Sequence, residues 1–319
     1  MNRFKKYLVV FCVALLMSGC GSAKEAEHIT KVASLKGPTT IGLLYLMNSE
    51  NADDYEFHMA AGADEILPMM VSGDADIALL PANVASVLYN KTNGAVEVLD
   101  INTLGVLYAV GTDENLQGIS DLKNRKVYIT GKGTTPDYVF QYLLSQNNMA
   151  DTVMLTCLSE PGEAVARLLE NPSSVAILPQ PFVTSALKQN PALHIICDLS
   201  KEWSSCDAKG ELVTGVTVCR KEFLEQYPKK VEAFINEHVK STEAAVAESN
   251  RAQTAANMVE AGILGKPEIA EAAIDGCNVT CITGDAMKNA LQGYLSVLYE
   301  YDVTSVGGKL PEEGFYYLN

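Results

Sequence analysis

Short apolar runs rich in β-branched residues alternate with helix-like stretches from residue 30 to residue 220. The runs predict strands at residues 30–35, 55–60, 77–80, 96–101, 106–110, 127–130, 153–158, 175–178, 193–197 and 216–219. This strand–helix alternation is typical of an α/β fold with largely parallel, buried strands.

After residue 220 the apolar spacing becomes helical. Apolar residues at 231, 234, 235 and 239 share one helix face, and those at 287, 291, 294, 295 and 298 share another. His238 lies at the edge of the first stripe, which indicates a packing role rather than a chemical one. We therefore expect a helical tail after the α/β part.

The chain divides into two predicted lobes. The polar stretch at residues 111–115, GTDEN, separates two apolar runs, and a strand returning at Val216 could rejoin the first sheet. The predicted first lobe comprises residues 30–110 and 206–319, and the second comprises residues 111–205. Each lobe is expected to hold a mixed, mostly parallel sheet flanked by helices, with a ligand cleft between the lobes.

The first residues predict export rather than a folded element. MNRFKKYLVVFCVALLMSGC has a basic start and an apolar run too short to span a bilayer, so residues 1–19 predict a secretory signal. The stretch LMSGC resembles a bacterial lipoprotein cleavage box, which implies lipidation of Cys20 and an extracytoplasmic, membrane-anchored protein. Residues 20–29 are expected to be a polar tether.

Charge and cysteine content narrow the function classes. The 319 residues carry 24 basic and 39 acidic side chains, for a formal net charge of −15, so nucleic acid is excluded as a partner.

Six cysteines follow Cys20, and the sequence alone does not choose a disulfide pairing among them. Cys157, Cys197 and Cys219 lie in strand-like runs and are expected to be buried free thiols, whereas Cys277 and Cys281 are close enough to pair. A metal site at His194, Cys197, Cys206 and Cys219 is disfavoured, because His194 and Cys197 would point to opposite faces of a strand. No metal or cofactor is predicted.

Two similar turns, KGPTT at residues 36–40 and GKGTTPD at residues 131–137, each follow a strand and precede a helix. The second is not a nucleotide-binding loop, because the Gly-x-x-x-x-Gly-Lys-Ser/Thr order is absent. PAN at residues 81–83 and PQP at residues 179–181 have the same placement. Ligands of open parallel sheets bind beyond the carboxyl ends of the strands, where helix N-termini present unpaired amides.

The same residues carry a family resemblance. SGDADIALLPANVA (72–85), GISDLKNRKVYITGKGTTPDYV (118–139) and VAILPQPFV (175–183) resemble the substrate-binding proteins of bacterial ABC importers, in the branch that binds thiamine pyrimidines, sulfonates, taurine or nitrate. The resemblance implies a periplasmic-binding-protein type 2 fold. It also implies a monomer that closes over a small molecule and delivers it to a permease and its ATPase.

Carried over by motif, the ligand contacts would be Lys36, Gly37, Pro38, Thr39, Thr40, Pro81, Ala82, Asn83, Gly131, Lys132, Gly133, Thr134, Thr135 and Gln180. Helix-end amides and threonine hydroxyls suit the oxygens of a sulfonate, carboxylate or nitrate. A pyrimidine would need an aromatic face, for which Tyr45, Tyr55, Tyr138 and Trp203 are candidates.

Two other function classes stay open. One is an enzyme on the same fold, similar to the eukaryotic thiamine-pyrimidine synthase, although the cysteines are scattered and no Gly-x-Ser-x-Gly or His-Glu-x-x-His motif occurs. The other is a sensory or surface lipoprotein without a transport role. We expect a binding protein with no catalytic residues.

Overall fold

A computed structural model describes residues 28–206 and 210–318 of the chain. The predicted signal at residues 1–19, the lipidation site Cys20 and the tether up to residue 27 lie outside these residues. Within them, no helix is long and apolar enough to span a membrane.

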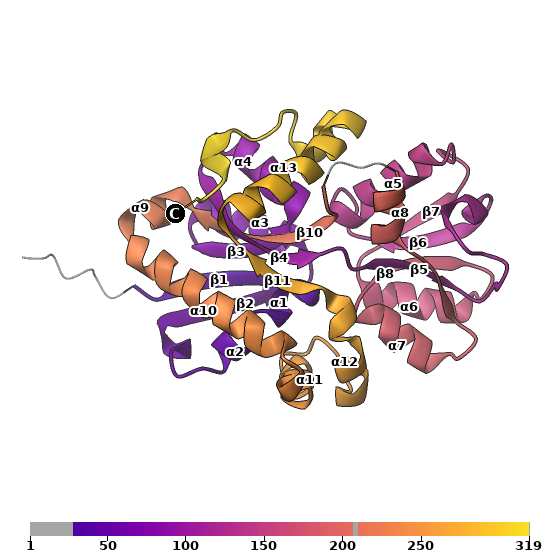
Figure 1. Cartoon of the computed structure of the whole chain (residues 1–319), viewed down its shortest axis with the longest axis horizontal. Helices are drawn as coiled ribbons and strands as arrows, with labels where there is room; N and C mark the ends of the chain where they lie inside the picture. Colours follow the sequence, from indigo (N-terminus) through magenta and orange to yellow (C-terminus); the bar gives the residue numbers. More distant parts are fainter. Residues whose placement is uncertain (1–27, 207–209, 319) are drawn as a thin grey trace, which may run out of the picture.

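Within residues 28–206 and 210–318, eleven strands form two sheets that lie side by side (Figure 1). The strands are β1 Thr30–Leu35, β2 Tyr55–Ala60, β3 Ile77–Pro81, β4 Val96–Leu104, β5 Leu107–Gly111, β6 Lys126–Thr130, β7 Met154–Leu158, β8 Val175–Pro179, β9 His194–Asp198, β10 Val213–Arg220 and β11 Val279–Ile282. The first sheet has the order β11-β4-β10-β3-β1-β2, and the second has the order β7-β6-β8-β5-β9. We call the parts built around them the first and second lobe.

The two sheets share one topology. In each sheet one antiparallel strand lies between two other strands: β10 lies between β3 and β4 in the first sheet, and β5 lies between β8 and β9 in the second. The strands β1, β2 and β3 pair in parallel, as do β6, β7 and β8. The expectation of an α/β fold with two mixed sheets is therefore confirmed.

The crossings between the lobes differ in part from the expected boundaries. The strand β5 pairs with β8 and β9, so residues 107–110 lie in the second lobe and the prediction that placed them in the first was wrong. The first crossing is the link between β4 and β5, at residues 105–106. The strand β10 rejoins the first sheet as expected. A local pattern identifies a strand but carries no information about which sheet it enters.

Helices cover both faces of each sheet. The helices are α1 Pro38–Ile41, α2 Leu44–Met47, α3 Ala63–Ser72, α4 Ala82–Lys91, α5 Thr135–Gln146, α6 Pro161–Glu170, α7 Phe182–Gln189, α8 Leu199–Ser205, α9 Lys221–Gln226, α10 Pro228–Val246, α11 Arg251–Glu260, α12 Pro267–Ala273 and α13 Gly284–Tyr301. On β3, Ala78 and Leu80 face the core under α3, α4 and α13, while Ile77 and Leu79 face the core under α9 and α10. Burial on both faces explains why these strands are continuous apolar runs.

Two local features were not expected. Residues 38–47 form two short helices rather than one, separated at Gly42 and Leu43. The strand β11 pairs antiparallel with β4 inside a region whose pattern predicted mostly helix. Its four residues are too few for a periodicity to be recognised.

Cys157, Cys197, Cys219, Cys277 and Cys281 are free thiols, so the pairing of Cys277 with Cys281 that the sequence allowed does not form. Cys197 and Cys219 are buried, as expected, but Cys157 is exposed, so the prediction of a buried thiol there was wrong. The strand β7 lies at the edge of its sheet, and its outward face meets solvent.

Alkaline pH should destabilise the fold through the buried thiols. Burial and the charge of Glu202 raise the pKa of Cys197 to about 12, whereas an unfolded cysteine titrates near about 8.5. At a pH above the pKa of the unfolded cysteine, the unfolded chain binds fewer protons than the folded chain, so the free energy of unfolding falls as pH rises. We expect Cys197 to contribute a loss of about 1–2 kcal/mol between about pH 8 and about pH 10. Urea unfolding under reducing conditions should show a shallower pH slope in Cys197→Ala; an unchanged slope would contradict this account.

Candidate functional site

A cavity of about 570 Å³ lies between the lobes, at the carboxyl ends of their strands. Its lining includes residues 36–39, which follow β1, and residues 131–136, which follow β6. The two similar turns of the sequence therefore meet at one cavity, each supplied by a different sheet. The shared topology of the sheets produces this meeting, because β1 and β6 occupy equivalent positions.

The first-lobe turn holds its hydroxyl groups against its own strand. The hydroxyl of Thr39 donates to the carbonyl of Leu35 at 3.2 Å, and that of Thr40 donates to the same carbonyl at 2.6 Å. Gly215 of β10 leaves room for this turn, since a Cβ there would lie 2.7 Å from the methyl group of Thr39. Lys36 is exposed at the start of the turn.

The second-lobe turn is closed by its own helix. The carboxylate of Asp137 accepts a hydrogen bond from the Gly133 amide at 2.8 Å and another from the Gln141 side chain at 2.6 Å. The hydroxyl of Thr134 donates to the carbonyl of Gly131 at 2.6 Å. Gly133 has φ 73° and open space where a side chain would project, so glycine suits this position on both counts.

These bonds change what the cavity can offer a ligand. The hydroxyl protons of Thr39, Thr40 and Thr134 and the Gly133 amide are engaged within the turns, so they are not spare donors. The charged side chains of the lining are Lys36 from the first lobe, Lys132 from the second, and Asp64. Most other lining side chains are aliphatic, and no aromatic side chain of the described residues contributes.

Most predicted contact residues line the cavity, but four do not. Those in the lining are Lys36, Gly37, Pro38, Thr39, Pro81, Gly131, Lys132, Gly133, Thr134 and Thr135, whereas Thr40, Ala82, Asn83 and Gln180 lie outside it. Gln180 is buried, and its side-chain oxygen accepts from the backbone amide and the hydroxyl of Thr184. The pattern of a turn fixes which backbone is near a ligand, but not which way each side chain points.

Asn83 joins the lobes instead of lining the cavity. Its side-chain amide donates to the carbonyl of Gly133 at 3.2 Å and to that of Ser305 at 3.1 Å. The hydroxyl of Thr135 lies 3.4 Å from the Asn83 oxygen and 3.3 Å from the Tyr294 phenol. Burial raises the pKa of Tyr294, so its phenol stays protonated and can donate. A hydrogen-bonded contact thus joins the start of α4, the start of α5 and α13.

Sequence reasoning missed a third pair of turns. Residues 61–64 after β2 and residues 158, 159 and 161 around the end of β7 also line the cavity. Both are strand-to-helix junctions, AGAD and SEPG, so the signal was present in the pattern. Thr214 on β10 was also missed, and its buried hydroxyl has no hydrogen-bond partner among the described residues.

The aromatic candidates lie elsewhere. The phenol of Tyr45 bonds to Thr254, and that of Tyr55 bonds to Glu237. The indole of Trp203 is buried and donates to the carbonyl of Gly210 at 3.1 Å. Tyr138 packs at the edge of the hydrophobic core. None of the four lines the cavity.

Comparison with solved structures identifies the architecture. An ABC transporter protein from Parabacteroides distasonis superposes with a TM-score of 0.73 at 25% identity, over 91% of this chain and 98% of that one. The periplasmic aliphatic sulphonate binding protein SsuA from Escherichia coli gives 0.71 at 13% identity, over 90% and 91%. The chain has the fold of the ABC-transporter periplasmic binding proteins. The nitrate-binding protein NrtA from Synechocystis PCC 6803 shares this periplasmic-binding fold, with a TM-score of 0.56 at 15% identity over 77% and 68%.

No protein-family model and no curated protein sequence matches the chain. In this chain the strand ends of both sheets line the cavity between the lobes, and the predicted turns meet there.

Loss of the Asn83 side chain should destabilise the protein. Asn83→Ala leaves the carbonyls of Gly133 and Ser305 without this donor in a buried site, at a cost of about 1–3 kcal/mol in the free energy of unfolding. Urea unfolding measures the difference.

The matched control is Asn90→Ala, whose amide bonds to the part-buried carbonyl of Val306 and the exposed carbonyl of Lys309. Water can replace the bond to Lys309, so the control should cost less. Equal losses in the free energy of unfolding of the two variants would show that the Asn83 contact between the lobes stabilises the protein no more than the Asn90 contact does.

Proposed function

We propose that the protein is the extracytoplasmic solute-binding component of an ABC importer, and that it captures a small molecule in the cavity between its lobes. The observation that carries the proposal is the convergence of strand-end turns from both sheets on one cavity. A molecule held by both lobes makes contacts that exist together only when the lobes are closed, so binding favours the closed form.

The lining favours a small aliphatic anion. One lysine ammonium group from each lobe can pair with a sulfonate or carboxylate, while the side chains of Leu35, Val84, Val106 and other aliphatic residues can enclose a short hydrocarbon part. A thiamine pyrimidine fits less well, because the described lining provides no aromatic ring to stack against it. The affinity for an anion would come from the lysines rather than from the threonine hydroxyls.

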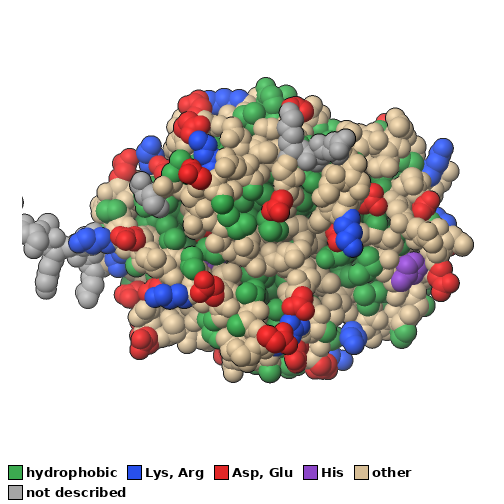
Figure 2. Space-filling view, in the orientation of Figure 1, with side chains coloured by type: hydrophobic (Ala, Val, Ile, Leu, Met, Phe, Trp, Pro, Cys, Tyr) green, Lys and Arg blue, Asp and Glu red, His purple; other side chains and the backbone are tan. Residues whose placement is uncertain are grey.

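Partners follow from this role. The closed protein would deliver its solute to a membrane permease driven by an ATPase, as a monomer held to the membrane through lipidated Cys20. The formal net charge of −15 disfavours nucleic acid. On the face shown in Figure 2, basic side chains lie among acidic ones and form no continuous patch.

The direct test is thermal unfolding of the mature protein with a panel of short alkanesulfonates, short carboxylates, nitrate, amino acids and pyrimidines. A true ligand at about a hundredfold over its Kd should add about 2.7 kcal/mol to the free energy of unfolding. We expect the sulfonates or carboxylates to stabilise the protein and to be recovered unchanged. Stabilisation by pyrimidines alone would overturn the ligand class, and consumption of the ligand would favour an enzyme instead.

The two cavity lysines should each contribute to anion affinity. Lys36→Ala and Lys132→Ala should each raise the Kd of the stabilising anion at least about tenfold, because each removes a charge-assisted contact. Calorimetric titration measures the Kd. Lys123→Ala is the matched control, an exposed lysine of the second lobe outside the cavity. A similar loss in all three variants would indicate a general charge effect.

A further inference from the structure

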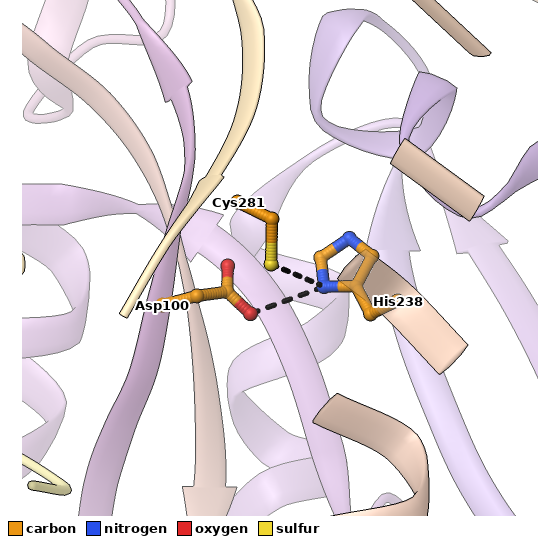
Figure 3. Close-up of side chains that lie close together, drawn as sticks. All are labelled: Asp100, His238 and Cys281. Carbon is orange, nitrogen blue, oxygen red and sulfur yellow. Dashed lines mark hydrogen bonds and ion pairs between the residues drawn. The ribbon is translucent and has the colours of Figure 1, made fainter. Parts of the chain in front are cut away.

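Three side chains that are distant in the sequence meet in the first lobe, away from the cavity (Figure 3). They are Asp100 on β4, His238 on α10 and Cys281 on β11. A carboxylate oxygen of Asp100 lies 3.0 Å from Nδ1 of His238, and the Cys281 sulfur lies 3.8 Å from the same nitrogen. We call these three residues the Asp–His–Cys cluster.

The cluster is not arranged for nucleophilic catalysis. In a Cys–His–Asp relay the thiol and the carboxylate use opposite nitrogens of the imidazole, so that a proton passes across the ring. Here both point at Nδ1, and Nε2 points away from them (Figure 3). Three different donor atoms lie within 4.8 Å of one another, an arrangement that can hold a metal ion with one coordination position left for a further ligand.

We propose that Asp100, His238 and Cys281 bind a divalent transition metal of the zinc class. Zinc takes carboxylate oxygen, imidazole nitrogen and thiolate sulfur at about 2.0–2.3 Å. A tetrahedral ion at those lengths separates nitrogen from oxygen by about 3.3 Å and nitrogen from sulfur by about 3.6 Å. The observed separations of 3.0 and 3.8 Å differ from these by a few tenths of an ångström.

Neighbouring side chains fix the position of the Asp100 carboxylate, as the residues around a metal ligand usually do. The second oxygen of Asp100 accepts a hydrogen bond from Thr217 at 2.8 Å, and Asn102 supports Thr217 at 3.2 Å. Such bonds orient a ligating carboxylate. Because Cys281 is only partly buried while Asp100 and His238 are fully buried, an ion could enter from the Cys281 side.

The Nε2 side of the His238 imidazole is also compatible with a metal ion on Nδ1. Nε2 of His238 and the hydroxyl of Thr242 are both buried, and neither has a hydrogen-bond partner among the described residues. Both face Gly42, where a Cβ would lie 3.1 Å from Nε2 and 2.7 Å from the hydroxyl. A metal on Nδ1 would leave the ring proton on Nε2, on the side of the ring that faces Gly42 and the Thr242 hydroxyl.

Charge balance favours the bound state. A divalent ion with one carboxylate, one thiolate and one neutral imidazole makes the cluster neutral as a whole. The ion would also join β4, α10 and the short strand β11, which pairs with β4 across a register shift.

Cobalt titration tests the proposal. Co²⁺ replaces zinc in such sites and gives a thiolate-to-cobalt charge-transfer band in the near ultraviolet. The full mature chain, stripped with EDTA, should take up one equivalent of Co²⁺ with this band, and Zn²⁺ should displace it and raise the Tm. A wild-type protein that binds no Co²⁺ through a thiolate would overturn the proposal without any variant.

Variants then locate the site. Cys281→Ser should lose the band and the Tm increase with Zn²⁺, whereas Cys157→Ser, which removes an exposed free thiol, should keep both. Asp100→Asn should weaken Co²⁺ binding at least about tenfold, since even loss of a supporting residue costs about 10–100-fold. If Asp100→Asn does not fold, Cys281→Ser still decides. A band that survives in Cys281→Ser and disappears in Cys157→Ser would place the ion elsewhere.

Discussion

The exchange of one strand between the two halves of the chain is the constraint on which the rest of the structure depends. The strand β10 supplies the hydrogen bonds between β3 and β4, and β5 supplies those between β8 and β9. Neither sheet is continuous until the chain has crossed to the other lobe. The crossings therefore fix the two sheets relative to each other, and the strand ends that line the cavity are brought together by the same connection.

The sequence predicts much of the strand content because buried strands are continuous apolar runs. The predictions at residues 30–35 and 55–60 match β1 and β2, and the turns at 36–40 and 131–137 lie where two sheets meet. The first crossing was misplaced because the run at 106–110 reads as a strand whichever sheet it joins. The strand β11 was missed because four residues show no period.

The sequence also did not predict the direction in which particular side chains point. Asn83 follows a strand as a ligand contact would, but its amide bonds across to Gly133 and back to Ser305. The cluster of Asp100, His238 and Cys281 was not foreseen, and His238 looked like a packing residue on a helical stripe. Its partners are 138 and 43 residues away in sequence, and only the pairing of β4 with β11 under α10 brings them together.

Trp203 shows a further consequence of how the lobes meet. It is the only tryptophan of the chain, it is fully buried, and its ring lies 5.0 Å from Tyr142 of the second lobe and 5.5 Å from Tyr294 of α13. The indole therefore occupies the boundary where the C-terminal helix rests on the opposite lobe. The native protein therefore carries a fluorophore at the boundary between its lobes, and its emission reports the packing there without any attached dye.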